Sequence, residues 1–329
     1  MAGTRTKRQH FVPRFYLEHF TDADGFVWAY DKQESSVRAD VPEATATETN
    51  FYSVKSESGE YDDSIEDWLS KIESDAAPLY PKLLRGDALV GDERAKFALF
   101  IASTYTRSPA MVNAVASAHG DLAQITSDMT VGDRASLEKI LDEAETTAGA
   151  ERSSDEVRDL LFKVWKEKQY VMAVDKHVGL MTIDLAHHVA DMMFSMQWFV
   201  YGNPDHRFIT SDNPVVRITP TEFVDRLYGD GGFLHKHMYI TTPLSPHRMV
   251  EMNWQKIGRT GLIKIDRNRV RELNRMRASF SERYLYSSVR DAGIASLAAK
   301  YARPGLRIDI GHPSERAPIE LHRKLKGAG

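Results

Sequence analysis

Thr210-Ser211-Asp212-Asn213-Pro214 is the stretch around which the sequence is organised. It lies between two short apolar runs, Phe208-Ile209 before it and Val215 to Ile218 after it. Asp and Asn side chains bond to backbone groups two residues on, and a proline keeps the residue before it out of the helical region. The stretch therefore predicts a sharp turn between strands that gathers a carboxylate, an amide and two hydroxyls. A turn with no chemical role is the alternative interpretation.

Strand-like patterns occur on both sides of this turn and again near the N-terminus. Met196 to Tyr201, Met238 to Pro243 and Arg248 to Asn253 are apolar runs separated by polar turns. Phe26 to Asp31 alternates large and small side chains, which indicates a half-buried strand, and Ser35 to Arg38 is its expected hairpin partner.

The middle of the chain is predicted to be helical. Ile65, Trp68, Leu69 and Ile72 follow helical spacing, and a second strong helix is expected from Asp92 to Arg107. We expect one α+β domain over residues 1–329, in which the helical middle packs against a small, mainly antiparallel sheet formed by the N-terminal and C-terminal segments. Its parts are an extended and strand segment (1–60), a helical part (61–195), a strand-rich part (196–310) and a tail (311–329).

Composition excludes several classes of function. The net charge of -4 and the pI near 6.3 give no global basic field for nucleic acid. The chain has no cysteine, which excludes disulfides and thiolate nucleophiles. No window contains the ~18 apolar residues that a membrane-spanning helix needs. We therefore expect a cytoplasmic protein with no membrane partner, in which any nucleic-acid contact is local.

One helix is strongly basic. Residues 267–280 contain five arginines, among which Arg271 and Arg275 are candidate phosphate ligands for a nucleic-acid backbone. A solvated face paired with nearby acids is the alternative.

Two further charged residues are placed by helical spacing. Glu73 borders the apolar stripe of its helix, and Arg107 lies at a helix end before Ser108-Pro109, where it either binds last-turn carbonyls or reaches into a cleft. Asp184, His187, His188 and Asp191 offer pairs of metal-capable side chains one turn apart. Spacing sets no third ligand, so no metal site is assigned.

Several motifs, taken together in this order, resemble the bacterial domain-of-unknown-function family 4238. They are His10-Phe11-Val12-Pro13-Arg14-Phe15-Tyr16-Leu17, Asn50-Phe51-Tyr52, Glu73, Arg107-Ser108-Pro109, Phe208 to Pro214, Pro243-Leu244-Ser245-Pro246 and Tyr286-Ser287. Arg107-Ser108-Pro109 replaces the Arg-Thr-Pro that is more frequent in the family and keeps a hydroxyl. The resemblance implies a single domain and brings no known reaction.

The motif positions include a base, acids and cations, so we predict a site that contains His10, Glu73, Arg107, Asp212 and Asn213. In such a cleft His10 and Glu73 would exchange protons, and Arg107 with Arg14 would clamp a phosphate. Asp212 and Asn213 would orient His10 or hold a divalent cation such as Mg²⁺ or Mn²⁺. These roles suit a nuclease-like hydrolase that cleaves phosphodiesters of RNA or DNA.

The alternative is a binding or interaction module, in which the same residues join the N-terminal segment to the helices through buried hydrogen bonds. Recognition of a small anionic ligand without turnover is a third hypothesis. Exposure separates these functions, because catalytic groups must line an open site. The catalytic interpretation also requires Asp212 or Asn213 to lie within hydrogen-bond reach of His10, Glu73 or Arg107, directly or through one water.

Overall fold

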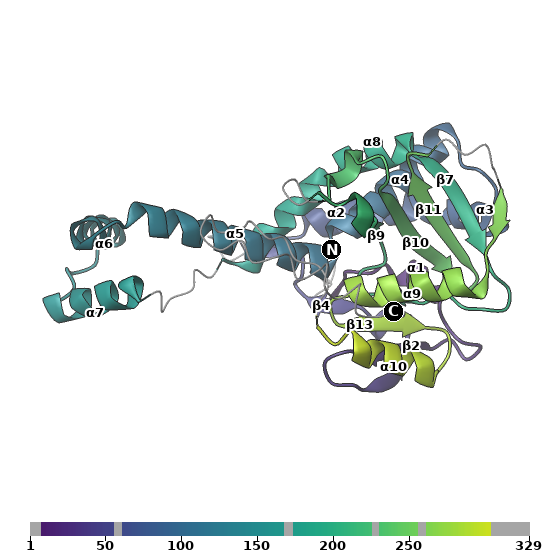
Figure 1. The fold of residues 1–329 in the computed structure, drawn as a ribbon, viewed down its shortest axis with the longest axis horizontal. Coiled ribbons are helices and arrows are strands. Elements are labelled where there is room, and N and C mark those ends of the chain that lie inside the picture. The colour runs from purple at the N-terminus through teal and green to yellow at the C-terminus, as the bar shows by residue number, and fades with distance from the viewer. Residues whose placement is uncertain (1–7, 56–60, 168–173, 226–229, 256–260, 304–329) are drawn as a thin grey trace, which may run out of the picture. The chain divides into compact units, whose positions relative to one another are not determined.

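The computed structural model describes residues 8–55, 61–167, 174–225, 230–255 and 261–303 (Figure 1). The chain divides into two compact units. The larger unit consists of Met1–Ala114 and Gly179–Arg307, and the smaller unit of Val115–Val178 and Ile308–Gly329. The single domain expected over residues 1–329 stays a prediction.

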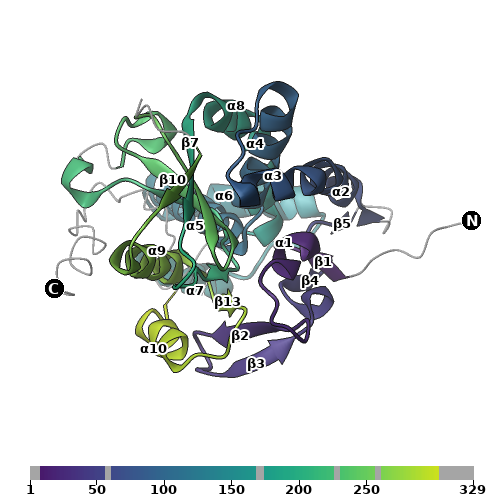
Figure 2. The ribbon, with the colours of Figure 1, turned by 90° about the vertical axis from the view of Figure 1, so that its right-hand side faces the viewer.

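A five-stranded sheet in the order β12-β7-β11-β10-β9 organises the larger unit. Its strands are β7 (Gln197–Gly202), β9 (Val216–Ile218), β10 (Tyr239–Ser245), β11 (Arg248–Asn253) and β12 (Leu262–Lys264). Neighbours are antiparallel except β12, which runs parallel to β7. Nearly every side chain of β10 and β11 is buried, because helices cover both faces. Figure 2 shows α9 (Arg267–Phe280) on one side and α3 (Tyr80–Arg85), α4 (Gly91–Thr106) and α8 (Ala186–Ser195) on the other.

The chain ends of the larger unit meet in a second, four-stranded antiparallel sheet. The N-terminal hairpin β2 (Val27–Asp31) and β3 (Val37–Asp40) pairs through β2 with β13 (Tyr284–Ser287), and β13 pairs with β8 (Thr210–Ser211). Helix α10 (Ala292–Lys300) packs against β2. The α+β class with mainly antiparallel pairing is thus confirmed, although the strands form several sheets.

Two predictions of local structure were wrong. Residues 41–50 are rich in Thr, Glu and Ala around Pro42, a composition that predicts a loop. The segment instead contains a 3-10 turn, Pro42–Ala44, and β4 (Thr47–Thr49), which pairs with β1 (Arg8–His10). The spacing of apolar residues from Val178 to Met193 predicts a helix over residues 171–195. The structure has a 3-10 segment, Lys176–Leu185, before α8, and residues 171–173 lie outside the described residues. Strand β4 was missed because its pairing partner lies far away in the sequence.

Helix α4 is the most deeply buried helix segment of the larger unit. Its last ten residues place nine side chains in the core, including Phe97 and Ile101, and the helix packs against α8 and α2 (Ser64–Ala76). The expected span from Asp92 is confirmed. Pro109 begins α5 (Pro109–Thr130), as expected from the favourable fit of proline in a first helical turn. The short α1 (Arg14–Glu18) and the two-stranded pair β5 (Val54–Lys55) and β6 (Tyr61–Asp62) complete the unit.

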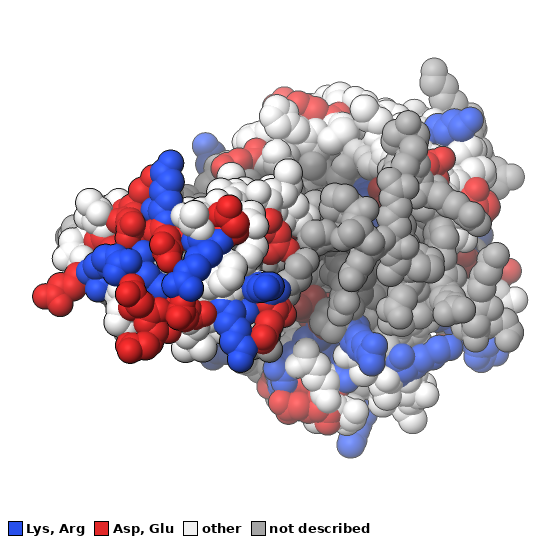
Figure 3. Space-filling view, turned by 60° about the vertical axis from the view of Figure 1, so that its left-hand side comes forward, with Lys and Arg blue, Asp and Glu red and all other residues white. Residues whose placement is uncertain are grey.

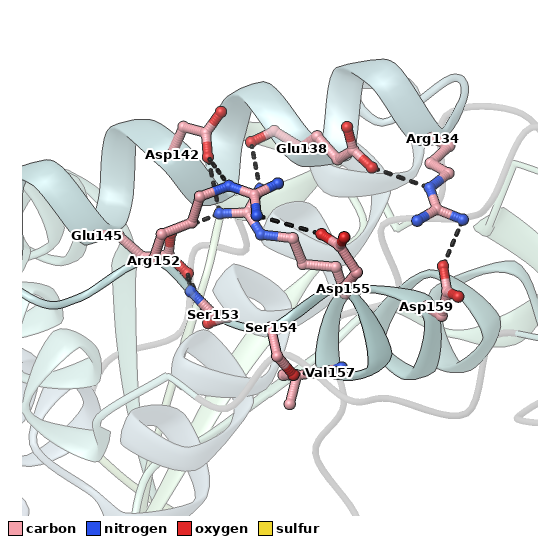
Figure 4. Close-up of polar contacts among 11 residues, drawn as sticks. Arg134, Glu138, Asp142, Glu145, Arg152, Ser153, Ser154, Asp155, Val157 and Asp159 are labelled. Carbon is pink, nitrogen blue, oxygen red and sulfur yellow. Dashed lines mark hydrogen bonds and ion pairs between the residues drawn. The ribbon is translucent and has the colours of Figure 1, made fainter.

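The smaller unit contains the C-terminal part of α5, α6 (Arg134–Ala148) and α7 (Asp155–Lys166). Asp133 and Ser154 cap the two shorter helices. Ion pairs join α6 to α7: Arg134 bridges Glu138 and Asp159, and Arg158 contacts Asp142 at 2.7 Å (Figure 4).

Acidic and basic side chains alternate over this helical surface in Figure 3.

Within the described part of the chain, no helix is long and apolar enough to cross a membrane.

Candidate functional site

The first candidate residue, His10, lies at the end of β1 with its ring half-buried. Its neighbour Gln9 is fully buried and fixes the strand: its amide donates to Ser53 Oγ at 2.7 Å, and its carbonyl accepts from the Tyr52 backbone N–H at 2.7 Å. Because successive side chains of a strand point to opposite faces, this anchor directs His10 away from the Gln9 contacts.

The tautomer of His10 follows from its hydrogen bond. Nε2 lies 3.3 Å from the carbonyl oxygen of Pro42, which can only accept, so Nε2 carries the proton. The neutral ring then presents its lone pair on Nδ1, which has no hydrogen-bond partner among the described residues. Burial lowers the pKa of His10, against the opposing effects of the Pro42 carbonyl and Glu73. His10 is therefore a neutral base at pH 7.

Arg107 and Glu73 form a buried ion pair beside this histidine. Arg107, at the C-terminal end of α4, is 1% exposed and donates from Nη2 to Glu73 Oε1 at 2.6 Å; the Glu73 side chain on α2 is 25% exposed. The charges of both residues act on the pKa of His10. A position at a helix end favours hydrogen bonds from an arginine to the last-turn carbonyls. Arg107 instead binds the carboxylate of Glu73. Its buried Nε has no partner within the described chain.

Sequence reasoning assigned no role to two further residues at this place. Glu66 is partly buried on α2, and burial raises its pKa, with Glu73 adding to the rise and Arg107 opposing it. Tyr52 is fully buried, and the charges of Arg107, Glu66 and Glu73 act on its hydroxyl. The seven-residue spacing of Glu66 and Glu73 was the available signal. We call His10, Glu66, Glu73 and Arg107 the His10 centre.

The chemistry available at the His10 centre is acid–base chemistry. Burial lowers the pKa of His10 and raises that of Glu66, so burial disfavours the charged form of both groups, and the neutral His10 is suited to accept a proton. Arg107 adds a fixed positive charge that is buried beneath the surface, and Glu73 neutralises much of that charge.

The Asp212 side chain binds the backbone that leads into β13, and not the residues of the His10 centre. Its carboxylate is buried and accepts three backbone N–H groups, from Glu282 at 2.9 Å, Arg283 at 2.6 Å and Tyr284 at 2.7 Å. These bonds tie the turn to the start of β13. Lys32, also buried, lies near enough for its charge to lower the pKa of Asp212.

Asn213 is equally enclosed by backbone. Its side-chain amide donates to the Phe280 carbonyl at 3.0 Å, and its backbone carbonyl accepts from the buried Arg277 of α9. Within the described chain, no hydrogen bond joins Asp212 or Asn213 to His10, Glu73 or Arg107. By their hydrogen bonds and ion pairs, the five predicted catalytic residues therefore fall into two groups, which are the His10 centre and the buried turn.

The opening motif and the turn do meet, through Tyr16. The Tyr16 hydroxyl lies 2.7 Å from Thr210 Oγ1 and donates to the Pro243 carbonyl at 2.8 Å. Three of the motifs noted in the sequence thus converge on one buried hydroxyl. This contact has the character of a structural clamp, because Tyr16 and Thr210 are both fully buried.

The predicted phosphate ligands lie at two places. Arg14 is half-exposed and pairs with Glu18 and Glu43. Arg271 and Arg275 are exposed on α9, one turn apart, with no ion-pair partner in the described ranges. Figure 2 shows α9 on the opposite side of the larger unit from β1 and α2, which carry His10, Glu66 and Glu73. The α9 arginines therefore do not flank the His10 centre.

Metal-capable residues do not gather at either place. Among the residues that the structure describes, no group of three or more His, Asp or Glu side chains is arranged to hold a metal ion. His187, His188, Asp184 and Asp191 are exposed around the start of α8, and the His187 ring lies 5.7 Å from that of Trp68.

Comparison with known proteins gives a family and no activity. No curated protein and no solved structure is significantly similar to the chain. A family model described as "Protein of unknown function (DUF4238)" matches residues 8–291, which includes the His10 centre, the Asp212 turn and α9. The chain belongs to the DUF4238 family.

Proposed function

We propose that the chain is a hydrolase whose acid–base groups are His10 and Glu66, with phosphodiesters of RNA or DNA as the substrate class. The observation that carries the proposal is the half-buried, neutral His10 beside the Glu73–Arg107 ion pair. Three separate segments, β1, α2 and the end of α4, bring these groups together. The charges of the same ion pair also act on Glu66, whose pKa burial raises, so both proposed groups lie within electrostatic range of Glu73 and Arg107.

Each residue then has a defined role. His10 Nδ1 accepts a proton from the attacking hydroxyl or water, and Glu66 gives a proton to the leaving oxygen. Arg107 is too deeply buried to contact the substrate, so the Glu73–Arg107 ion pair acts on the reaction through the effect of its charges on the pKa of His10. The exposed α9 arginines, on the other side of the unit, would contact phosphates distant from the cleaved bond.

The test is cleavage of labelled single-stranded RNA, tRNA and DNA, with and without Mg²⁺ or Mn²⁺. We expect His10→Ala and Glu66→Gln each to lower the rate by at least ~100-fold, the range of general acid–base catalysis. His188→Ala and Asp75→Asn are matched controls on exposed residues and should keep full activity. Cleavage that persists unchanged in both His10→Ala and Glu66→Gln, or is absent from the wild type, contradicts the proposal.

The α9 arginines allow a separate readout. Arg271→Ala together with Arg275→Ala should weaken binding of long RNA, and the loss should shrink as salt rises. Cleavage of a dinucleotide should be unchanged, because so short a substrate does not reach α9 from the His10 centre.

A non-catalytic interaction module is the second candidate function. The enclosure of Asp212 and Asn213 and the Tyr16 clamp favour it, since these motif residues serve the fold. It predicts that His10→Ala lowers stability and changes no turnover, so the same variants separate the two functions.

A further inference from the structure

Three polar side chains connect β1 to the start of α2 through hydrogen bonds. The Gln9 amide donates to Ser53 Oγ at 2.7 Å, and Ser53 Oγ donates to Asp63 Oδ1 at 2.5 Å. Gln9 and Ser53 are buried, and Asp63 immediately precedes α2. We call these three residues the Ser53 bridge. The bridge joins the strand that carries His10 to the helix that carries Glu66.

The hydrogen bonds of the Ser53 bridge run in one direction. A carboxylate can only accept, so the single hydroxyl proton of Ser53 points to Asp63, and the Ser53 oxygen accepts from the Gln9 amide. The Gln9 carbonyl accepts from the backbone N–H of Tyr52, which fixes the orientation of its amide. Satisfied polar networks inside a protein rigidify it and specify one arrangement. The bridge therefore holds β1 and α2 at one separation.

Asp63 makes this contact instead of the usual contact of its position. An aspartate directly before a helix normally accepts a hydrogen bond from an N–H of the first turn. Asp63 makes no such capping bond, and the Asp62 carboxylate accepts from the Ser64 N–H at 2.9 Å. The Asp63 carboxylate is thus used to bind Ser53 and not to cap α2.

Glu66 lies in the part of α2 nearest to the Ser53 bridge. Asp63 precedes it by three residues, which is less than one helical turn. The buried residues of α2, which are Leu69, Ile72 and Ala76, all lie after Glu66. Burial raises the pKa of Glu66, and the charge of Asp63 adds to the rise, so the two carboxyl groups are close in space. The position of Glu66 therefore depends on Asp63.

We propose that Ser53 is a positioning residue, which through Gln9 and Asp63 holds His10 and Glu66 at the separation that acid–base catalysis requires. This role rests on the proposed function and assigns a support to the His10 centre besides its own ion pair. A displacement of ~1 Å at a catalytic site can lower the rate by roughly 100-fold. Loss of one link of the bridge should therefore slow the reaction without removing either acid–base group.

The experiment compares variants of the full chain that break the bridge with one that keeps it. Ser53→Ala and Asp63→Ala each remove a link, whereas Asp63→Asn keeps an acceptor oxygen for the Ser53 hydroxyl. Asp63 is partly exposed, so Asp63→Ala carries the test if Ser53→Ala does not fold.

The first readout is the pKa of His10, measured by NMR titration without substrate. Burial lowers this pKa most, and the charged groups that act on it are Glu73 of α2, Arg107 at the end of α4 and Arg14 of α1. Both bridge-breaking variants should raise the pKa toward its ordinary value, because a displaced β1 exposes the ring to water. Asp63→Asn should leave it unchanged.

The second readout is cleavage of a dinucleotide. Ser53→Ala and Asp63→Ala should lower kcat at least ~tenfold and change KM less than ~twofold, because the groups that contact the substrate are kept. Asn274→Ala is the matched control, since Asn274 of α9 also loses two hydrogen bonds, from the Ile209 N–H at 3.1 Å and to the Arg207 carbonyl at 2.9 Å. It should lower stability in urea and keep the wild-type kcat and His10 pKa.

An unchanged His10 pKa in the folded bridge-breaking variants overturns the proposal. An equal fall of kcat in Asn274→Ala also overturns it, because the effect would then follow stability alone. If the wild type cleaves no substrate while Ser53→Ala and Asp63→Ala raise the pKa of His10, the proposed function fails and the positioning of His10 by the Ser53 bridge stands.

Discussion

Asp212 gives the sharpest prediction of stability, because opposing effects act on one buried carboxylate. Burial raises its pKa from 3.8 to about 6, and the three N–H groups and Lys32 only partly oppose the rise. Such a shift corresponds to about 3 kcal/mol between the two protonation states. The perturbation is Asp212→Asn, studied as a function of pH.

The sign follows from proton binding. Between pH 4 and pH 6 the folded chain holds the Asp212 proton more tightly than the unfolded chain does. Stability from this group is therefore fully present below pH 4 and is lost as the pH rises through 6. The amide that Asp212→Asn introduces does not titrate. From pH 4 to pH 7, the free energy of unfolding of the wild type should therefore fall by about 2–3 kcal/mol relative to that of this variant.

The assay is urea unfolding of both proteins at pH values from 4 to 7, which keeps below the pKa of Lys32, lowered by burial to about 8. The difference between the two free energies of unfolding cancels the distant titrating groups. If the wild type instead becomes more stable relative to Asp212→Asn as the pH rises, the reasoning is refuted. It would mean that the hydrogen bonds from residues 282–284 outweigh burial and hold the Asp212 pKa below its ordinary value.

Three other substitutions probe the framework of the larger unit by the same urea assay. Tyr16→Phe leaves the Thr210 hydroxyl and a carbonyl without their phenol and should cost about 1–3 kcal/mol; an unchanged midpoint would contradict the clamp. Arg277→Met removes the guanidinium that donates to the carbonyls of Asn213, Pro214 and Thr241, of which Asn213 keeps the Ser211 hydroxyl as a donor. It should cost about 1–3 kcal/mol for each carbonyl left unpaired, whereas a small loss would show that water replaces the guanidinium. Gly86→Ala forces a non-glycine residue to φ +87° and places a Cβ 2.9 Å from Leu262 Cβ. It should cost at least ~1–2 kcal/mol, and wild-type stability would show that the turn relaxes.

Local pattern predicted those parts of the fold whose physics is local. The α4 helix, the start of α5 at Pro109 and the β2–β3 hairpin follow from periodicity and turn chemistry between residues close in sequence. Strand β4 does not, because its three residues become a strand only through pairing with β1.

The turn at residues 210–214 shows where local reasoning stops. A local side-chain bond does form, but Ser211 makes it, by accepting from the Asn213 N–H at 3.1 Å. This leaves the Asp212 carboxylate free to bind backbone about seventy residues later in the chain. The residue types at the turn predicted hydrogen bonds to backbone, but they carried no information on which side chain would bind distant backbone.

The candidate site was predicted in part for the same reason. Glu73 and Arg107 pair across 34 residues, and His10 lies close enough for both charges to act on its pKa. Glu66 was the missed member, because an exposed position and a partly buried one look alike at the edge of a helical stripe. Only the packing of α2 beside Arg107 distinguishes them.

Exposure decides which motif residues can test the proposed function. Asp212 is 2% exposed and Asn213 3%, so their substitution acts first on folding, and a loss of activity in Asp212→Ala would not identify a catalytic group. Glu73 remains 25% exposed, and His10 and Glu66 are also accessible. Enzyme and interaction module predict the same behaviour for the sealed residues and different behaviour for the accessible ones. A decisive test of function must therefore use His10 and Glu66, in variants whose folding is shown to be intact.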